Sequence, residues 1–283
     1  LNLRSTPQRF LIGRATGIAA LGMEGDFNTA DRAAGGGVIR ISGTAGFGAI
    51  QRETSLAVAV GSMAHEFGHA LGLPDLFDRS FLTDNSQAPA QDSAGIGHWG
   101  LMGWGATGWY GNDGPAPLSA WSRQRLGWLT TNNGRLVQVT GDTSDVVVQD
   151  VQTGGAIVRV PLPPEPSTRA SVEQGYLLLE QRVRSSYYNR NQPQDGLLVW
   201  HVRPSRRDNN DESGKLVDLV CADGSFTDAG FPLGRAPAPH GGRDNLDFWA
   251  HDLTYARGHT GNRGDATDVF DGVRFQRLDL TSN

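Results

Sequence analysis

Residues 65–75, with the sequence HEFGHALGLPD, combine side chains that can bind a metal ion and move a proton. In an α-helix His65 and His69 are one turn apart, so both imidazoles project from nearly the same face and can bind one ion. Glu66 lies beside them and can take a proton from water and pass it to a leaving amine. Gly72 can end the helix with a positive φ, which lets a later side chain return to the metal. This spacing predicts metal-assisted hydrolysis.

Asp75 is the expected third metal ligand. Zinc hydrolases with this motif take that ligand from a glutamate on a later helix, or from a His or Asp shortly after a glycine turn. The chain has no glutamate between Glu66 and Glu165, so a later helix has few glutamates that could serve as the third ligand. Asp75 has better spacing than Asp78, which is the second candidate. The other interpretation of Asp75 is a turn residue that caps the next segment.

The helix that must carry the two histidines is expected over about residues 53–71. Residues 56–64 are apolar almost all round, which is typical of a buried helix. Ionisable side chains at the end of such a helix need a partner, because an unpaired buried charge costs several kcal/mol. A bare H-E-x-x-H can arise by chance, but Gly72 and Asp75 favour a metal site over that alternative.

A second informative segment is GHWGLMGWG at residues 97–105. Metzincin-type sites have a methionine-containing turn beneath the metal, and Met102 is the candidate for it. Its thioether would form an apolar floor under the histidines without bonding the metal. The alternative is an ordinary core methionine in a loop. His98 is expected to be a surface or structural histidine, not a ligand.

Together with PLSAWSRQRLGWL at residues 117–129, these motifs resemble the immune inhibitor A family of secreted bacterial zinc metallopeptidases. The likeness extends over about residues 38–272 and includes GYLLLEQRV (175–183), GLLVWHVR (196–203), LVDLVCADG (216–224) and GDATDVF (264–270). The resemblance implies a secreted, extracellular zinc endopeptidase that acts on proteins or peptides. It implies His65, His69 and Asp75 as zinc ligands, Glu66 as general base, and often structural calcium.

Two features depart from the family pattern. The stretch before residue 38 looks shorter than the N-terminal half of the family's catalytic domain, which supplies several strands above the active-site helix. Here only GGGVIRISG, residues 35–43, is expected to be a strand, and its edge could pair with an extended peptide substrate. Trp104 stands two residues after Met102, where some metzincins have a transition-state tyrosine, so no tyrosine is given a catalytic role.

The expected fold class is α+β. A metzincin-like zinc-protease catalytic half with an active-site helix is expected over residues 1–130, and a β-rich, sandwich-like half over residues 131–283. A second helix is expected over about 118–126, with Pro117 in its first turn and Gly127 at its end. After residue 130 the β runs are residues 136–141, 145–151, 156–162, 175–183, 196–202 and 216–222.

Composition limits the classes of partner. The 283 residues are 38% hydrophobic, enough for one large domain or two modest ones. A net charge of −5 gives no sign of a basic surface, so nucleic acid is not an expected partner.

Cysteine content and hydropathy say little about location. The lone cysteine, Cys221, excludes an internal disulfide and fits either a secreted or a cytoplasmic protein. The apolar run before His65 is too short to span a membrane. The start of the chain carries no signal sequence, as expected of a mature form or a fragment.

Three acidic and amide-rich clusters are candidates for calcium binding: residues 208–212, 244–247 and 265–271. None matches the regular twelve-residue calcium loop, and polar turns often have this composition. Glu180 and His201 lie in β runs and are expected to be paired polar residues on a sheet face.

The sequence therefore predicts a secreted zinc endopeptidase, and two alternatives stay open. One is a catalytically degenerate, metal-stabilised binding module with an incomplete substrate cleft. The other is a structural β-rich surface protein in which the motif is fortuitous. Metal analysis and a peptide digest would separate the three.

Overall fold

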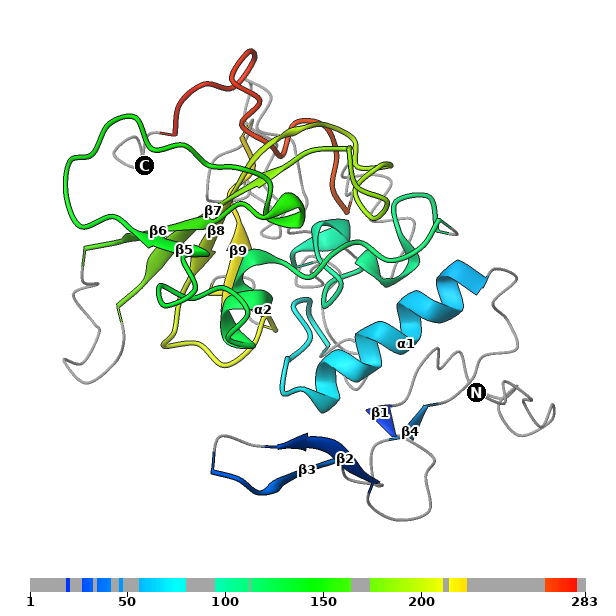
Figure 1. Cartoon of the computed structure of the whole chain (residues 1–283). Coiled ribbons are helices and arrows are strands. Elements are labelled where there is room, and N and C mark those ends of the chain that lie inside the picture. The colour runs from blue at the N-terminus through cyan, green and yellow to red at the C-terminus, as the bar shows by residue number, and fades with distance from the viewer. Residues whose placement is uncertain are drawn as a thin grey trace.

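The computed structural model describes residues 19–20, 27–32, 35–41, 46–47, 56–79, 95–111, 113–163, 174–210, 214–222 and 263–278. The described elements include the helices α1 (Leu56–Ala70) and α2 (Ala120–Arg125) and a five-stranded mixed sheet. Figure 1 shows α1 on one side of the molecule and the sheet on the other, with the loops after residue 95 between them. The predicted α+β class is confirmed at this level.

The sheet has the strand order β5-β6-β7-β8-β9. Its strands are β5 (Leu136–Gln138), β6 (Ile157–Pro161), β7 (Tyr176–Arg182), β8 (Gly196–Val202) and β9 (Val217–Leu219). β5 and β6 run parallel, and the other neighbours are antiparallel. The long central strands β7 and β8 pair along their whole length, and most of their side chains are buried. Two covered faces explain why these strands read as nearly continuous apolar runs.

The N-terminal region has more strands than the sequence indicated. β2 (Phe27–Arg32) pairs antiparallel with β3 (Val38–Ile41), and β1 (Ala19–Ala20) pairs with β4 (Gly46–Phe47). β3 lies inside the strand expected over residues 35–43. β2 was missed because its sequence, FNTADR, is mostly polar and lacks an apolar alternation.

Both helices form where expected, with shifted ends. α1 lies within the predicted 53–71, of which residues 53–55 are outside the described residues. α2 begins later than predicted because the Ser119 hydroxyl accepts a hydrogen bond from the Ser122 N–H at 3.3 Å and caps the helix. Gly127, with φ +74°, ends it as expected.

The main hydrophobic core contains residues from both before and after residue 130 in the sequence. Trp99, Met102 and Trp121 pack in one cluster with sheet residues such as Leu178 and Trp200. The two predicted halves therefore share a core, and the domain boundary at residue 130 stays a prediction.

Two details of the β-rich half differ from the sequence analysis. No strand forms over residues 145–151: Val147 is 79% exposed, and the 3-10 helix η5 (Val151–Thr153) begins at the end of this segment. Valines without a neighbouring strand or a covered face do not make a strand stable. The sandwich-like arrangement is not confirmed, because the described residues after 130 form one sheet. Among the described residues, no helix is long and apolar enough to cross a membrane.

Candidate metal centre

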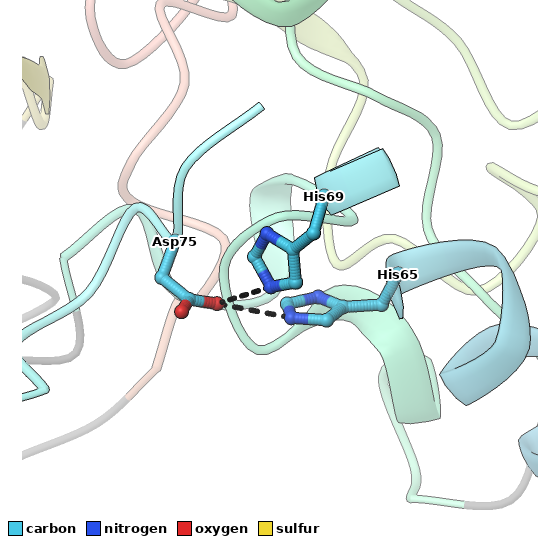
Figure 2. A group of neighbouring side chains, drawn as sticks. All are labelled: His65, His69 and Asp75. Atoms are coloured by element: carbon cyan, nitrogen blue, oxygen red, sulfur yellow. Dashed lines mark hydrogen bonds and ion pairs between the residues drawn. The ribbon is translucent and has the colours of Figure 1, made fainter. Parts of the chain in front are cut away.

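Three side chains converge at the end of α1. His65 and His69 project from one face of the helix, with ring centroids 4.9 Å apart and ring planes at 89°. One oxygen of Asp75, Oδ1, lies 3.0 Å from Nε2 of His65 and 3.2 Å from Nε2 of His69 (Figure 2). One potential ligand atom from each residue lies within 4.8 Å of the others. The structure therefore brings together the three residues predicted to bind the metal.

Backbone carbonyls orient both imidazoles. Nδ1 of His65 lies 2.7 Å from the carbonyl oxygen of Leu101, and Nδ1 of His69 lies 2.8 Å from that of Leu73. A carbonyl only accepts, so each Nδ1 carries a hydrogen and each Nε2 faces Asp75. When the rings are neutral, two Nε2 lone pairs and a carboxylate oxygen face one another, which is unfavourable unless a proton or a metal cation lies between them. The donor set fits a metal ion.

A glycine-ended helix cap delivers Asp75 to the histidines. Gly72 has φ +89°, its N–H donates to the His69 carbonyl at 2.9 Å, and the Leu73 N–H donates to the Gly68 carbonyl at 3.0 Å. These two bonds form a Schellman motif. The motif places the Leu73 carbonyl against the His69 ring and reverses the chain toward Asp75, as the sequence predicted for Gly72.

Met102 lies against α1 at Gly68, the residue before His69. Its side chain is fully buried, and a Cβ built on Gly68 would lie 2.4 Å from the Met102 sulfur. The Met102 carbonyl also accepts a hydrogen bond of 2.8 Å from the Leu76 N–H. The methionine segment therefore contacts both the helix and the chain that follows Asp75. Glycine at position 68 is what allows the sulfur to approach this closely.

Asp75 is held from its other side by Arg79. Nε of Arg79 lies 3.1 Å from Oδ2 of Asp75, so the two carboxylate oxygens have different partners. Burial by itself would raise the pKa of Asp75, but its hydrogen bonds to His65 and His69 hold that pKa well below its usual range. Burial by itself would lower the pKa of His69, and the hydrogen bond and charge of Asp75 raise it above the ordinary value. Asp78, the second candidate, is buried but outside this group.

Glu66 lies on α1 beside His65. Its side chain is partly buried and makes no hydrogen bond or ion pair in the described part of the chain. It is near enough to the histidines for its charge to raise the pKa of His69. A carboxylate without a hydrogen-bond or ion-pair partner among the described residues, next to the three converging side chains, can accept and return a proton.

His98 has a structural setting. Its Nδ1 lies 3.1 Å from the Trp104 carbonyl, and burial together with the charge of Arg263 lowers its pKa to about 4. Among the described residues it does not belong to the potential metal-binding group.

Residues of the β-rich half hold the methionine segment in place. Arg182 donates a hydrogen bond of 2.7 Å to the Trp99 carbonyl, and the carboxylate of Asp268 accepts one from the Trp99 indole. Arg182 in turn pairs with the fully buried Glu180 at 3.0 Å, as expected of a paired polar residue in the sheet. Because Trp99 lies two residues before Leu101, these contacts help to place the carbonyl that orients His65.

Asn209 holds the chain after Asp75. Its amide nitrogen donates to the carbonyls of Leu76 at 3.1 Å and Val217 at 2.7 Å, and its amide oxygen accepts from the Val217 N–H at 3.1 Å. Sequence reasoning placed Asn209 in a candidate calcium cluster and missed this role. Nothing in the local sequence indicates that it meets Leu76.

The other acidic clusters also make turn contacts. Asp265 accepts the Thr267 N–H at 2.7 Å, and Asp271 accepts the Val273 N–H at 2.9 Å. Such contacts are typical of polar turns. Residues 211–212 and 244–247 lie outside the described residues. Calcium binding stays a prediction.

One comparison with known proteins identifies the catalytic region. The family model described as "Immune inhibitor A peptidase M6, catalytic domain" matches residues 30–136. That segment contains α1, the three converging side chains and Met102. No curated protein matches the chain. The resemblance seen in the motifs is thus confirmed over residues 30–136, which match the catalytic domain of the immune inhibitor A (M6) peptidase family.

Proposed function

We propose that the chain is a secreted, zinc-dependent endopeptidase that hydrolyses peptide bonds of proteins. The observation that carries this proposal is the convergence of His65, His69 and Asp75, with both Nε2 atoms directed at one carboxylate oxygen. The family match supplies the reaction class, peptide hydrolysis. The secreted, extracellular location rests on the family resemblance alone, and assaying culture medium against cell lysate of the source organism would test it.

The chemistry of the donors favours zinc. Two imidazole nitrogens and one carboxylate oxygen are ligands that zinc prefers, whereas calcium and magnesium prefer oxygen alone. Three protein ligands are typical of catalytic zinc sites, which keep a further coordination position open. The carbonyls of Leu101 and Leu73 fix the imidazole orientation from behind, as hydrogen-bond partners of metal ligands commonly do. In this proposal Met102 forms the apolar floor of a metzincin-like centre.

Glu66 is the general base of the proposed mechanism. When bound, zinc supplies a Lewis acid for the attacking water and the scissile carbonyl. The carboxylate of Glu66 takes the proton from the water as the water attacks the carbonyl carbon. The same carboxyl group then donates this proton to the leaving amine nitrogen, which regenerates the carboxylate. Glu66 suits both steps because it has no competing hydrogen-bond partner among the described residues.

The variant Glu66→Gln tests the mechanism. The amide cannot accept the proton, so we expect kcat/KM on a quenched fluorescent peptide to fall by about a thousandfold or more. Zinc content, measured by atomic emission after dialysis, is expected to stay at one equivalent. His69→Ala is the matched control and should lose both zinc and activity. Full activity of Glu66→Gln would refute the assignment of the base.

The same assay separates the enzyme from the degenerate binding module. That alternative predicts stoichiometric zinc with no cleavage of casein or a mixed peptide library by the wild-type chain. The proposed function predicts cleavage that stops when the metal is chelated and returns when zinc is added back.

A further inference from the structure

A cavity of about 910 Å³ adjoins the metal centre. Its lining includes His69, one of the three converging side chains, and Gly72, just after the C-terminal end of α1. Further lining residues come from α2, from strands β6 and β7, and from the loop after β8. A peptide bound at the metal centre would therefore pass close to this cavity. Its volume is in the range of ligand-binding pockets.

The lining is strongly basic. Arg125, Arg159, Arg206 and Arg207 all line the cavity, and no aspartate or glutamate occurs among the described lining residues. The chain as a whole carries a net charge of −5, whereas the four arginines make the charge at this site positive. Positive charge gathered in a cleft attracts an anionic ligand.

The arginines differ in how they are held. The guanidinium of Arg159 lies 3.8 Å from the centroid of the Tyr176 ring, and the Tyr176 hydroxyl donates to Gln124 at 3.1 Å. This stacking fixes one cation against an aromatic wall. Arg125 and Arg207 make no hydrogen bond or ion pair in the described part of the chain, so no described residue occupies their donors.

We infer that this cavity is the specificity subsite for an acidic side chain of the peptide substrate. The inference rests on the proposed endopeptidase function and adds a substrate class to it. Arginine binds carboxylates through two parallel N–H bonds, so aspartate or glutamate at a position flanking the scissile bond matches the site. A lysine at that position meets four like charges and is disfavoured.

The test measures kcat/KM of the zinc-loaded full chain on peptides that carry Glu, Gln or Lys at each position within four residues of the cleaved bond. At one position we expect Glu to exceed Gln by about tenfold, with Lys lower still, because a charge-assisted pair replaces a neutral hydrogen bond. Each peptide is made with a free C-terminal carboxylate and with an amide. A preference that follows the terminus would assign the arginines to a C-terminal carboxylate and overturn the inference.

Charge reversal at one arginine sharpens the test. Arg207→Glu should lower kcat/KM for the Glu peptide and raise it for the Lys peptide, with a smaller change for the Gln peptide than for either. Arg277→Glu changes the net charge equally at an exposed arginine outside the cavity lining, and should leave all ratios unchanged. Equal cleavage of the Glu, Gln and Lys peptides, or equal effects of the two variants, would overturn the inference.

A binding measurement separates this inference from the proposed function. Fluorescence anisotropy with the Glu66→Gln variant reports peptide affinity without turnover, and the Glu peptide should bind about tenfold more tightly than the Gln peptide. Selective binding of the Glu peptide without cleavage by the wild-type chain would refute the endopeptidase function and support the acidic-side-chain subsite. Cleavage without a preference for the Glu peptide would support the endopeptidase function and refute the subsite.

Discussion

Two regions contribute to the metal centre: residues 65–75, which supply the candidate ligands, and the β-rich half, which supports them. They differ in how far apart in the sequence the contacting residues lie. The candidate ligands and Glu66 all come from residues 65–75. The groups that hold them in place come from the β-rich half: Arg182 meets Trp99 across 83 residues, and Asn209 meets Leu76 across 133. The positions of the candidate ligands follow from helix geometry and one turn. The positions of the supporting groups depend on contacts between distant parts of the fold. We therefore expect changes in the first region to act on metal affinity and changes in the second to act on stability.

The largest effect that would test this comparison is expected from Arg182→Met. Arg182 is buried, and removing it leaves the Glu180 charge unpaired in the core and the Trp99 carbonyl without its donor. Breaking a buried pair in this way costs about 3–5 kcal/mol. We expect the free energy of unfolding, measured by urea titration with tryptophan fluorescence, to fall by that amount.

A double variant controls for simple loss of packing. Glu180→Gln combined with Arg182→Met removes both charges and keeps an oxygen that can accept from the Trp200 indole. Part of the lost stability should return, because no buried charge is then left unpaired. If the single variant unfolds like the wild type, the β-rich half does not support the metal centre as described.

How much the sequence could predict follows the same division. His65, His69, Asp75 and Gly72 were placed correctly relative to one another because helix periodicity and a glycine turn are local properties. Asn209 was missed because its partners are distant, and a run of Asn and Asp indicates a turn or a calcium loop equally well.

One signal for the distant support was present in the sequence. Glu180 and Arg182 stand two residues apart in the strand YLLLEQR and therefore share a face. Opposite charges on one face of an otherwise apolar strand indicate a buried ion pair. What the sequence could not give was the target of that pair, the Trp99 carbonyl. The strand expected over 145–151 was wrong for the related reason that three consecutive valines do not reveal whether a neighbouring strand exists.

The variant Gly72→Ala tests the local region. Gly72 has φ +89°, and no atom lies within 4 Å of a Cβ built there, so backbone strain is the only penalty. Strain of this kind costs about 1–2 kcal/mol. We expect that loss of stability together with weaker zinc binding, because the cap aligns the Leu73 carbonyl and Asp75 with His69. Urea titration and competition with a zinc chelator measure the two effects.

Gly127→Ala is the matched control for that variant. Gly127 ends α2 with φ +74° and the same pair of hydrogen bonds, and its Cβ would also meet open space. It should lose a similar amount of stability and keep the wild-type zinc affinity. Equal zinc affinities for the two variants would contradict the role given to the Gly72 cap.

The smallest effect is expected from Arg79→Gln. Arg79 is 60% exposed and pairs with the Asp75 oxygen that faces away from the histidines, so it positions a ligand without binding the metal. Loss of such a partner typically weakens metal binding by 10- to 100-fold, and solvent exposure places Arg79 at the lower limit. We expect zinc affinity to fall about tenfold, or about 1.4 kcal/mol, with the free energy of unfolding of the metal-free chain nearly unchanged. Arg184→Gln removes a similarly exposed ion pair, to Asp195 at 3.0 Å, from a site outside the metal group and should not alter zinc affinity. If the variant lowers the stability of the metal-free chain and leaves zinc affinity unchanged, Arg79 supports the fold and does not position a ligand. That result would contradict the division between a local region that sets metal affinity and a distant region that sets stability.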